Sequence, residues 1–159
     1  MGVSVPTIHF LDANGRMQAA PSESFNFRPA VYGILIEYDQ ILLLRDPESQ
    51  LFCPPGRIVA ENEAPAQAVR HYFRRLAEMT PVLGPLLFVE NQYRKENDTF
   101  WQLSVLYYAV ERPSTASIRF AEDPEAKTQP EWVRLDSLDR TQFQFGYQAV
   151  QAGKLRLQL

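Results

Sequence analysis

Apolar and polar residues alternate along much of the chain, and this pattern predicts strands. In Thr99–Val110, every second residue from Trp101 onward is aromatic or apolar, which is the period of a strand with one buried face. Shorter runs rich in β-forming residues add further predicted strands, namely Val31–Glu37, Ile41–Arg45, Leu86–Tyr93, Ile118–Phe120 and Trp132–Leu135.

A helical period dominates one segment, Ala64–Met79. Its apolar residues recur at spacings of three and four, so that Ala68, Tyr72 and Leu76 fall on one arc. Asn62 is a candidate N-cap, and the helix should stop before Pro81. A second helix is predicted over Gln144–Ala152, with Gly153 ending it, after a helical turn at residues 136–138.

The first residues predict a β-hairpin. Two short apolar runs in Thr7–Met17 flank Asp12-Ala13-Asn14-Gly15, and Asn-Gly favours a tight turn. Pro21–Asn26 is expected to be a polar connector. The order of strands, helix, strands and helix predicts an α+β protein, an α/β/α sandwich with a mixed central sheet. We expect residues 1–27 to form hairpin and connector and residues 28–159 to form the main body of a single globular domain.

Composition narrows the class of partner and compartment. The chain has 159 residues and a net charge of −3, too mild to favour duplex nucleic acid or an acidic membrane as the main partner. Its apolar stretches are too short to span a bilayer, and the first ten residues do not resemble a signal peptide. One cysteine, Cys53, allows no internal disulfide. We therefore expect a cytoplasmic protein.

Two stretches carry a resemblance to a known family. Arg28-Pro29-Ala30-Val31, Ile41–Arg45 and Phe52-Cys53-Pro54-Pro55-Gly56 resemble the entry to the Nudix box, and residues 131–138 are similar to the segment that closes the Nudix core. The resemblance to the Nudix hydrolase family implies a Nudix-type α/β/α sandwich. It also implies action on a nucleoside diphosphate derivative, with Mg²⁺ as the cofactor expected for an intact box.

The box in this chain is degenerate, because the helix lacks the carboxylates that the family uses. Glu63 matches the first Glu of the family pattern, but Tyr72, Arg75 and Leu76 stand where the metal ligands belong. Hard divalent cations prefer carboxylate oxygens, and an arginine repels them. The sequence therefore predicts no metal and no cofactor at this helix.

The candidate site residues follow from the same alignment. Glu63 and Glu131 are weak candidates for a catalytic role. Arg57, which replaces the box glycine, His71 and Arg75 are candidates for substrate binding, because a guanidinium can hold a phosphate without a metal. The alternative interpretations are a helix N-terminal charge for Glu63 and a solvated surface residue for Arg75.

Two functions of different class remain open. One is a Nudix-type pyrophosphohydrolase, whose hydrolysis the lost carboxylates place in doubt. The other is a non-catalytic nucleotide-binding sensor or interaction module. Either would bind a nucleotide-like small molecule, and the unpaired edge of the hairpin is suited to pairing in a homodimer.

Overall fold

The computed structural model describes residues 5–12, 15–122 and 127–158. The strands are β1 (Thr7–Leu11), β2 (Met17–Pro21), β3 (Phe25–Ile34), β4 (Ile36–Glu37), β5 (Gln40–Arg45), β6 (Phe52–Cys53), β7 (Gly56–Ile58), β8 (Val82–Glu96), β9 (Thr99–Glu111) and β10 (Gln129–Arg134). The α-helices are α1 (Pro65–Ala77) and α2 (Tyr147–Gln158), and short 3₁₀ turns occupy Ser22–Ser24, Leu135–Ser137 and Arg140–Gln142.

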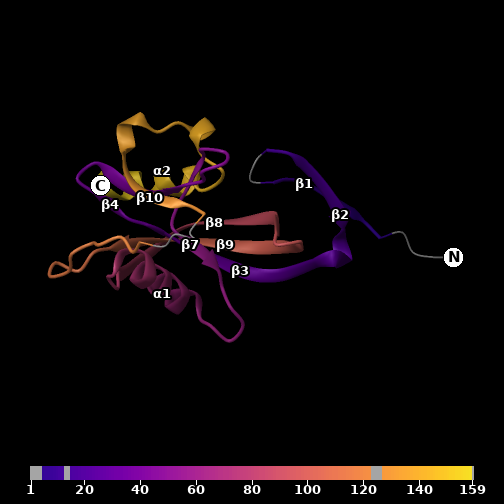
Figure 1. The fold of residues 1–159 in the computed structure, drawn as a ribbon, viewed down its shortest axis with the longest axis horizontal. Coiled ribbons are helices and arrows are strands. Elements are labelled where there is room, and N and C mark those ends of the chain that lie inside the picture. Colours follow the sequence, from indigo (N-terminus) through magenta and orange to yellow (C-terminus); the bar gives the residue numbers. More distant parts are fainter. Residues whose placement is uncertain (1–4, 13–14, 123–126, 159) are drawn as a thin grey trace.

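The strands form a layer with one α-helix on each side, as Figure 1 shows. One sheet has the order β7-β3-β9-β8 and is mixed, since β3 runs parallel to β9 while the other pairs are antiparallel. A second sheet has the order β10-β5-β4, with β6 paired to β5. The predicted α+β sandwich with a mixed sheet is confirmed.

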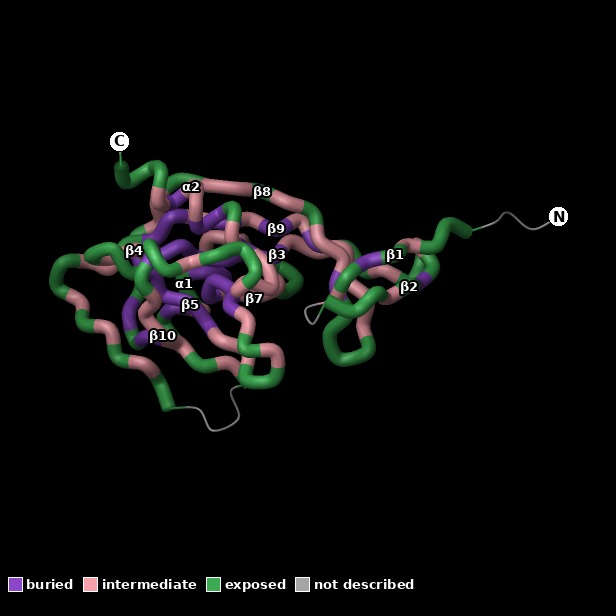
Figure 2. Tube along the Cα trace, turned by 90° about the horizontal axis from the view of Figure 1, so that it is seen from above, coloured by how far each residue is buried: buried purple, intermediate pink, exposed green. Residues whose placement is uncertain are grey.

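Alternation along β3 explains why both faces of this layer are covered. Val31 of β3, and Leu35 directly after the strand, belong to the buried cluster that includes Phe73 of α1. Tyr32 and Ile34 belong to the cluster that includes Ala149 of α2. Successive side chains of a strand point to opposite faces, so this one strand contributes to both cores. Figure 2 shows the buried residues gathered in this body.

The N-terminal hairpin is present, with β1 antiparallel to β2. Its anchor is Phe10, which is 7% exposed and packs edge-on against Phe25 and Phe100 and at 6.5 Å from Tyr93. The predicted turn includes residues 13 and 14, which lie outside the described residues. In Figure 1 the hairpin bends back over the ends of β8 and β9 on the side of α2.

Strand β3 begins earlier than the sequence predicted. The expected connector Pro21–Asn26 is instead a 3₁₀ turn followed by the start of β3 at Phe25. Parallel pairing with β9 continues from Phe25 opposite Phe100 to Ile34 opposite Ala109. These long-range partners override the local polar composition. The strand thus runs without a break past residue 28, where the main body was expected to begin.

The predicted strand Ile118–Phe120 is wrong, since the described part of the chain has no strand between β9 and β10. The backbone N–H groups of Arg119 and Ala121 instead donate to the carbonyl oxygens of Ala77 and Leu76. The last carbonyls of a helix lack partners within the helix, so this segment caps the end of α1 rather than joining a sheet.

The start of α1 also differs from the prediction. Ala64 is the N-cap, and Asn62 lies two residues earlier with φ 62°. The amide of Gln67 accepts from the backbone N–H of Ala64, which satisfies one of the free donors at this end. The helix ends at Ala77, and its C-cap, Glu78, takes a left-handed conformation.

Gly153 does not end α2, as was predicted, but lies inside it. A Cβ at this position would lie 2.8 Å from Cγ2 of Ile34 and 3.3 Å from Cδ1 of Leu87. The glycine therefore permits close packing of the helix on the sheet. Among the described residues, no helix is long and apolar enough to cross a membrane.

Candidate functional site

The turn between β6 and β7 is fixed by close packing on β3. Pro54 and Pro55 are buried, and a Cβ on Gly56 would lie 2.0 Å from the carbonyl oxygen of Val31. Only glycine tolerates that approach. Cys53, next to this turn, is buried, and burial raises the pKa of its thiol to about 12, which is typical of a structural cysteine.

Glu63, Arg57 and His71 come together at the start of α1. Arg57 Nη2 donates to Glu63 Oε2 at 2.7 Å, and His71 Nδ1 lies 3.3 Å from the same oxygen. The other oxygen of Glu63 accepts from the backbone N–H of Ala60 at 3.2 Å. The hydrogen bond from Arg57 is the main reason why the pKa of Glu63 falls to about 2, although partial burial opposes it. This cluster ties the loop after β7 to the helix.

The positions of the missing box carboxylates do not fit a divalent cation. Tyr72 and Leu76 are partly buried and pack against the apolar cluster that contains Phe73, as the apolar arc predicted. Burial raises the pKa of Tyr72 above its usual range, which disfavours ionisation of its phenol. Arg75 is exposed on the same helix. Mg²⁺ requires several oxygen ligands, and these three side chains offer no carboxylate.

Within the described ranges, no group of three or more His, Cys, Asp or Glu residues has a geometry that could hold a metal ion. Glu131, the other acidic candidate, is engaged elsewhere. Its two oxygens accept from Nε and Nη2 of Arg45 at 2.9 and 2.7 Å, and the Arg45 guanidinium lies 4.4 Å from the centre of the Phe52 ring. Glu131 thus pairs β10 with β5 and does not join Glu63.

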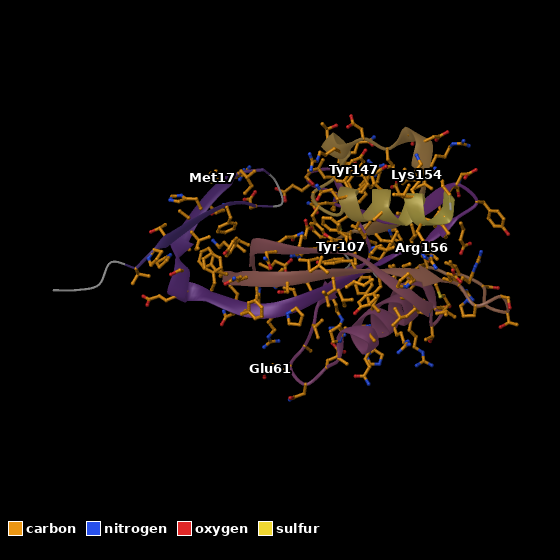
Figure 3. The ribbon with its side chains drawn as sticks, turned by 180° about the vertical axis from the view of Figure 1, so that it is seen from behind. Met17, Glu61, Tyr107, Tyr147, Lys154 and Arg156 are labelled. Carbon is orange, nitrogen blue, oxygen red and sulfur yellow. The ribbon has the colours of Figure 1, made fainter. Side chains whose placement is uncertain are left out.

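A second candidate for ligand binding is a cavity on the other face of the sheet. This cavity has a volume of about 370 Å³ and is bounded by the hairpin, β8 and the segment leading into α2. Its lining includes Leu11 from the hairpin, Glu90 and Gln92 from β8, and Phe145 and Tyr147 from the α2 side. Figure 3 shows Tyr147 on this side of the sheet and Glu61, in the loop before α1, on the opposite side.

A chain of hydrogen bonds crosses the floor of this cavity. Tyr107 donates its hydroxyl to Glu90 Oε1 at 2.6 Å, and Gln92 Nε2 donates to the same oxygen at 2.6 Å. Arg94 Nη2 donates to Gln92 Oε1 at 2.5 Å, and Arg94 Nη1 donates to the Tyr32 hydroxyl at 2.8 Å.

Arg94 is 8% exposed, and its guanidinium lies 4.5 Å from the centre of the Phe145 ring. A buried charge is costly without such partners. Glu96, 3.3 Å from Arg94 Nη1, supplies the opposite charge.

The residues proposed from the box and the residues of the cavity are separate sets. Arg57, Glu63 and His71 form one cluster on the α1 side, whereas Arg75 and Glu131 do not take part in it. The cavity lining contains none of these five residues. Their roles in catalysis or binding stay predictions.

Sequence reasoning missed the polar face of β8. Glu90, Gln92, Arg94 and Glu96 occur at every second position, and such spacing places them on one face of a strand. Polar residues on a face that also carries a core residue such as Phe88 are the pattern that could have identified the cavity floor.

The sheet between two helices and the turn at Pro54-Pro55-Gly56 together define a protein of the Nudix fold. No protein-family sequence model matches the chain, and no curated protein matches it by sequence. Solved structures do match. A MutT Nudix hydrolase from Burkholderia pseudomallei is 23% identical with a TM-score of 0.56, over 72% of this chain and 88% of that one.

A Nudix hydrolase from Nitrosomonas europaea is 13% identical with a TM-score of 0.58, over 82% of this chain and 90% of that one. A structure described as a UDP-X diphosphatase is 14% identical with a TM-score of 0.57, over 82% of this chain and 64% of that one. The resemblance inferred from the sequence is therefore confirmed at the level of the fold.

Proposed function

We propose that this protein binds a nucleoside diphosphate derivative in the cavity between the hairpin, β8 and α2, and that it does so without metal-dependent hydrolysis. The observation that carries the proposal is the combination of aromatic walls and a polar floor in that cavity. Phe145 and Tyr147 offer ring surface, while Glu90, Gln92 and Arg94 offer hydrogen-bonding groups.

The size and chemistry of the cavity suit such a ligand. Small-molecule sites usually measure about 300–1,000 Å³ and combine apolar walls with a few fixed polar groups. The cavity of about 370 Å³ lies in that range. A base can stack on aromatic rings while polar side chains contact its edge. One neighbour of similar fold is named for a uridine diphosphate substrate, which supports the ligand class.

The chemistry of α1 supports the proposed absence of hydrolysis. Cleavage of a diphosphate builds charge on phosphate oxygens, which a divalent cation normally neutralises while it activates water. Tyr72, Arg75 and Leu76 supply no ligand for that cation. The chemistry left to this helix is therefore binding, and hydrolysis of ordinary Nudix substrates should be slow or absent.

A thermal-shift screen of nucleoside diphosphates and their conjugates, with and without Mg²⁺, tests this function. A ligand that binds only the folded state raises the melting temperature, and we expect a rise that does not require Mg²⁺. Two results would contradict the proposal. One is the absence of a shift with every nucleotide, and the other is turnover of about 1–1000 per second with Mg²⁺.

Paired variants locate the ligand. Tyr147→Ala removes an aromatic wall of the cavity, and we expect calorimetry to show weaker binding. Tyr38→Ala is the matched control, because Tyr38 is 94% exposed and does not line this cavity. Equal affinities for the two variants would exclude the cavity.

The rival location is the phosphate clamp on α1. Arg75→Ala should then weaken binding at least tenfold, while Arg74→Ala should leave it unchanged, since a charge-assisted hydrogen bond contributes about 1.5–3 kcal/mol. A ligand held in the cavity predicts that neither change has a large effect. The two pairs of variants together therefore assign the ligand to one face of the sheet.

A further inference from the structure

We propose that Glu90 makes this cavity selective for a guanine-type base, one that presents two adjacent N–H donors. The inference rests on the proposed function, because it names the base within the nucleotide-binding cavity. The hydrogen bonds along β8 are the basis of this selectivity, because they determine which side-chain atoms face a ligand.

The chain has a defined direction that begins at Arg94. A guanidinium can only donate hydrogen bonds, so the atom of Gln92 that faces Arg94 Nη2 at 2.5 Å must be the amide oxygen. The amide nitrogen of Gln92 is then directed to Glu90 Oε1, at 2.6 Å. Arg94 itself is held by the Tyr32 hydroxyl, by Glu96 and by the Phe145 ring, so the amide of Gln92 has one favoured orientation.

This arrangement saturates one oxygen of Glu90 and leaves the other for a ligand. Oε1 receives two donors, the Tyr107 hydroxyl and Gln92 Nε2, both at 2.6 Å. In the part of the chain that the structure describes, Oε2 receives no hydrogen bond, although Glu90 lines the cavity. An ionised carboxylate accepts and does not donate. The floor of the cavity therefore presents an acceptor oxygen.

The common bases differ in what they present to such an oxygen. Guanine carries adjacent donors, a ring N–H and an exocyclic amino group, which can converge on one carboxylate oxygen. Adenine and cytosine place a ring acceptor beside their amino group, and uracil has one ring N–H between two carbonyl oxygens. A ring acceptor or carbonyl beside Glu90 would leave two acceptors in repulsive contact, which is costly in a buried site.

The first test compares ligands on the unmodified protein. Calorimetry with guanosine, inosine and adenosine diphosphates at fixed salt should give the tightest binding for the guanosine compound. Inosine lacks the exocyclic amino group, so we expect about tenfold weaker binding, the effect of one lost hydrogen bond to a charged group. Equal affinity for the three ligands would overturn the selectivity and leave nucleotide binding intact.

The second test changes the acceptor. In Glu90→Gln, the amide oxygen can still accept from Tyr107 and Gln92, and the new amide nitrogen then replaces Oε2. A donor now faces the donors of guanine, so the guanosine compound should lose at least tenfold in affinity while the adenosine compound does not weaken. Glu111→Gln removes the same charge at an exposed position at the end of β9 and serves as the control.

The outcomes separate the two proposals. If no nucleotide binds the unmodified protein, the proposed function fails. If nucleotides bind but Glu90→Gln weakens all of them equally, at an unchanged melting temperature, Glu90 does not select the base and this inference fails alone. If the variant melts early, the comparison of the three ligands on the unmodified protein still decides the question.

Discussion

We predict that the ion cluster of Arg57, Glu63 and His71 at the start of α1 makes the stability of the protein depend on pH. Glu63 is 15% exposed at its side chain and accepts from Arg57 at 2.7 Å. A fall of the carboxyl pKa from 4.5 to about 2 corresponds to about 3 kcal/mol in favour of the folded state. Because Arg57 is 34% exposed, solvent screening reduces this, and we expect Glu63→Gln to lose about 1–2 kcal/mol at neutral pH.

The sign of the pH dependence follows from the lowered pKa. Stability from Glu63 is fully present above the unfolded pKa and is lost as the pH falls through the folded pKa, between about pH 5 and pH 2. Urea unfolding at several pH values should show the largest difference between wild type and Glu63→Gln near pH 7. The difference should shrink by roughly half or more at about pH 3.

A matched variant distinguishes this cluster from ordinary surface charge. Glu61→Gln breaks the Arg28–Glu61 pair, whose carboxylate is 78% exposed, and we expect a much smaller change. Carbon-detected NMR titration should place the Glu63 midpoint well below that of ordinary glutamates. A Glu63 midpoint near 4.5, or a stability difference that stays constant with pH, would refute the reasoning.

Three further predictions concern packing and chemistry. Gly153→Ala should lower the free energy of unfolding by about 1 kcal/mol, because the new methyl group crowds Ile34 and overpacking exceeds the gain in helix propensity; an unchanged urea midpoint would contradict it. Phe10→Ala should speed amide exchange in β1 and β2 by removing the anchor in the aromatic cluster, and unchanged exchange would show that Phe10 does not hold the hairpin. Crystals soaked in Mn²⁺ should show no anomalous peak near Glu63, and a peak within coordination distance would restore a metal site there.

Local patterns predicted the elements whose evidence lies within a few residues. The period of two identified β9, and the recurrence of Ala68, Tyr72 and Leu76 identified the face of α1 that meets the core. The predictions were wrong where residues distant in the sequence determine the local structure. The segment at Ile118–Phe120 caps a helix formed about 40 residues earlier, and Gly153 fits against Ile34 on another element.

The cavity could be predicted only in part, because residues that are distant in the sequence complete it. The alternating polar residues from Glu90 to Glu96 are visible in the sequence, but nothing local shows that Tyr107 and Tyr32 complete their hydrogen bonds. The family resemblance drew the prediction to the box helix, where Arg57, His71 and Arg75 lie. The cavity floor is built by strand pairing, and the residues of the Nudix box give no information about that pairing.

The position of the hairpin links two equilibria. Leu11 and Asp12 line the cavity, so a ligand that requires this wall binds only when the hairpin is docked. Docking and binding then favour each other by the same coupling free energy. Saturating ligand should slow hydrogen exchange in Thr7–Leu11 and Met17–Pro21, while loss of the hairpin should raise the dissociation constant. The docking equilibrium of the N-terminal hairpin would thereby respond to whether the cavity holds a ligand.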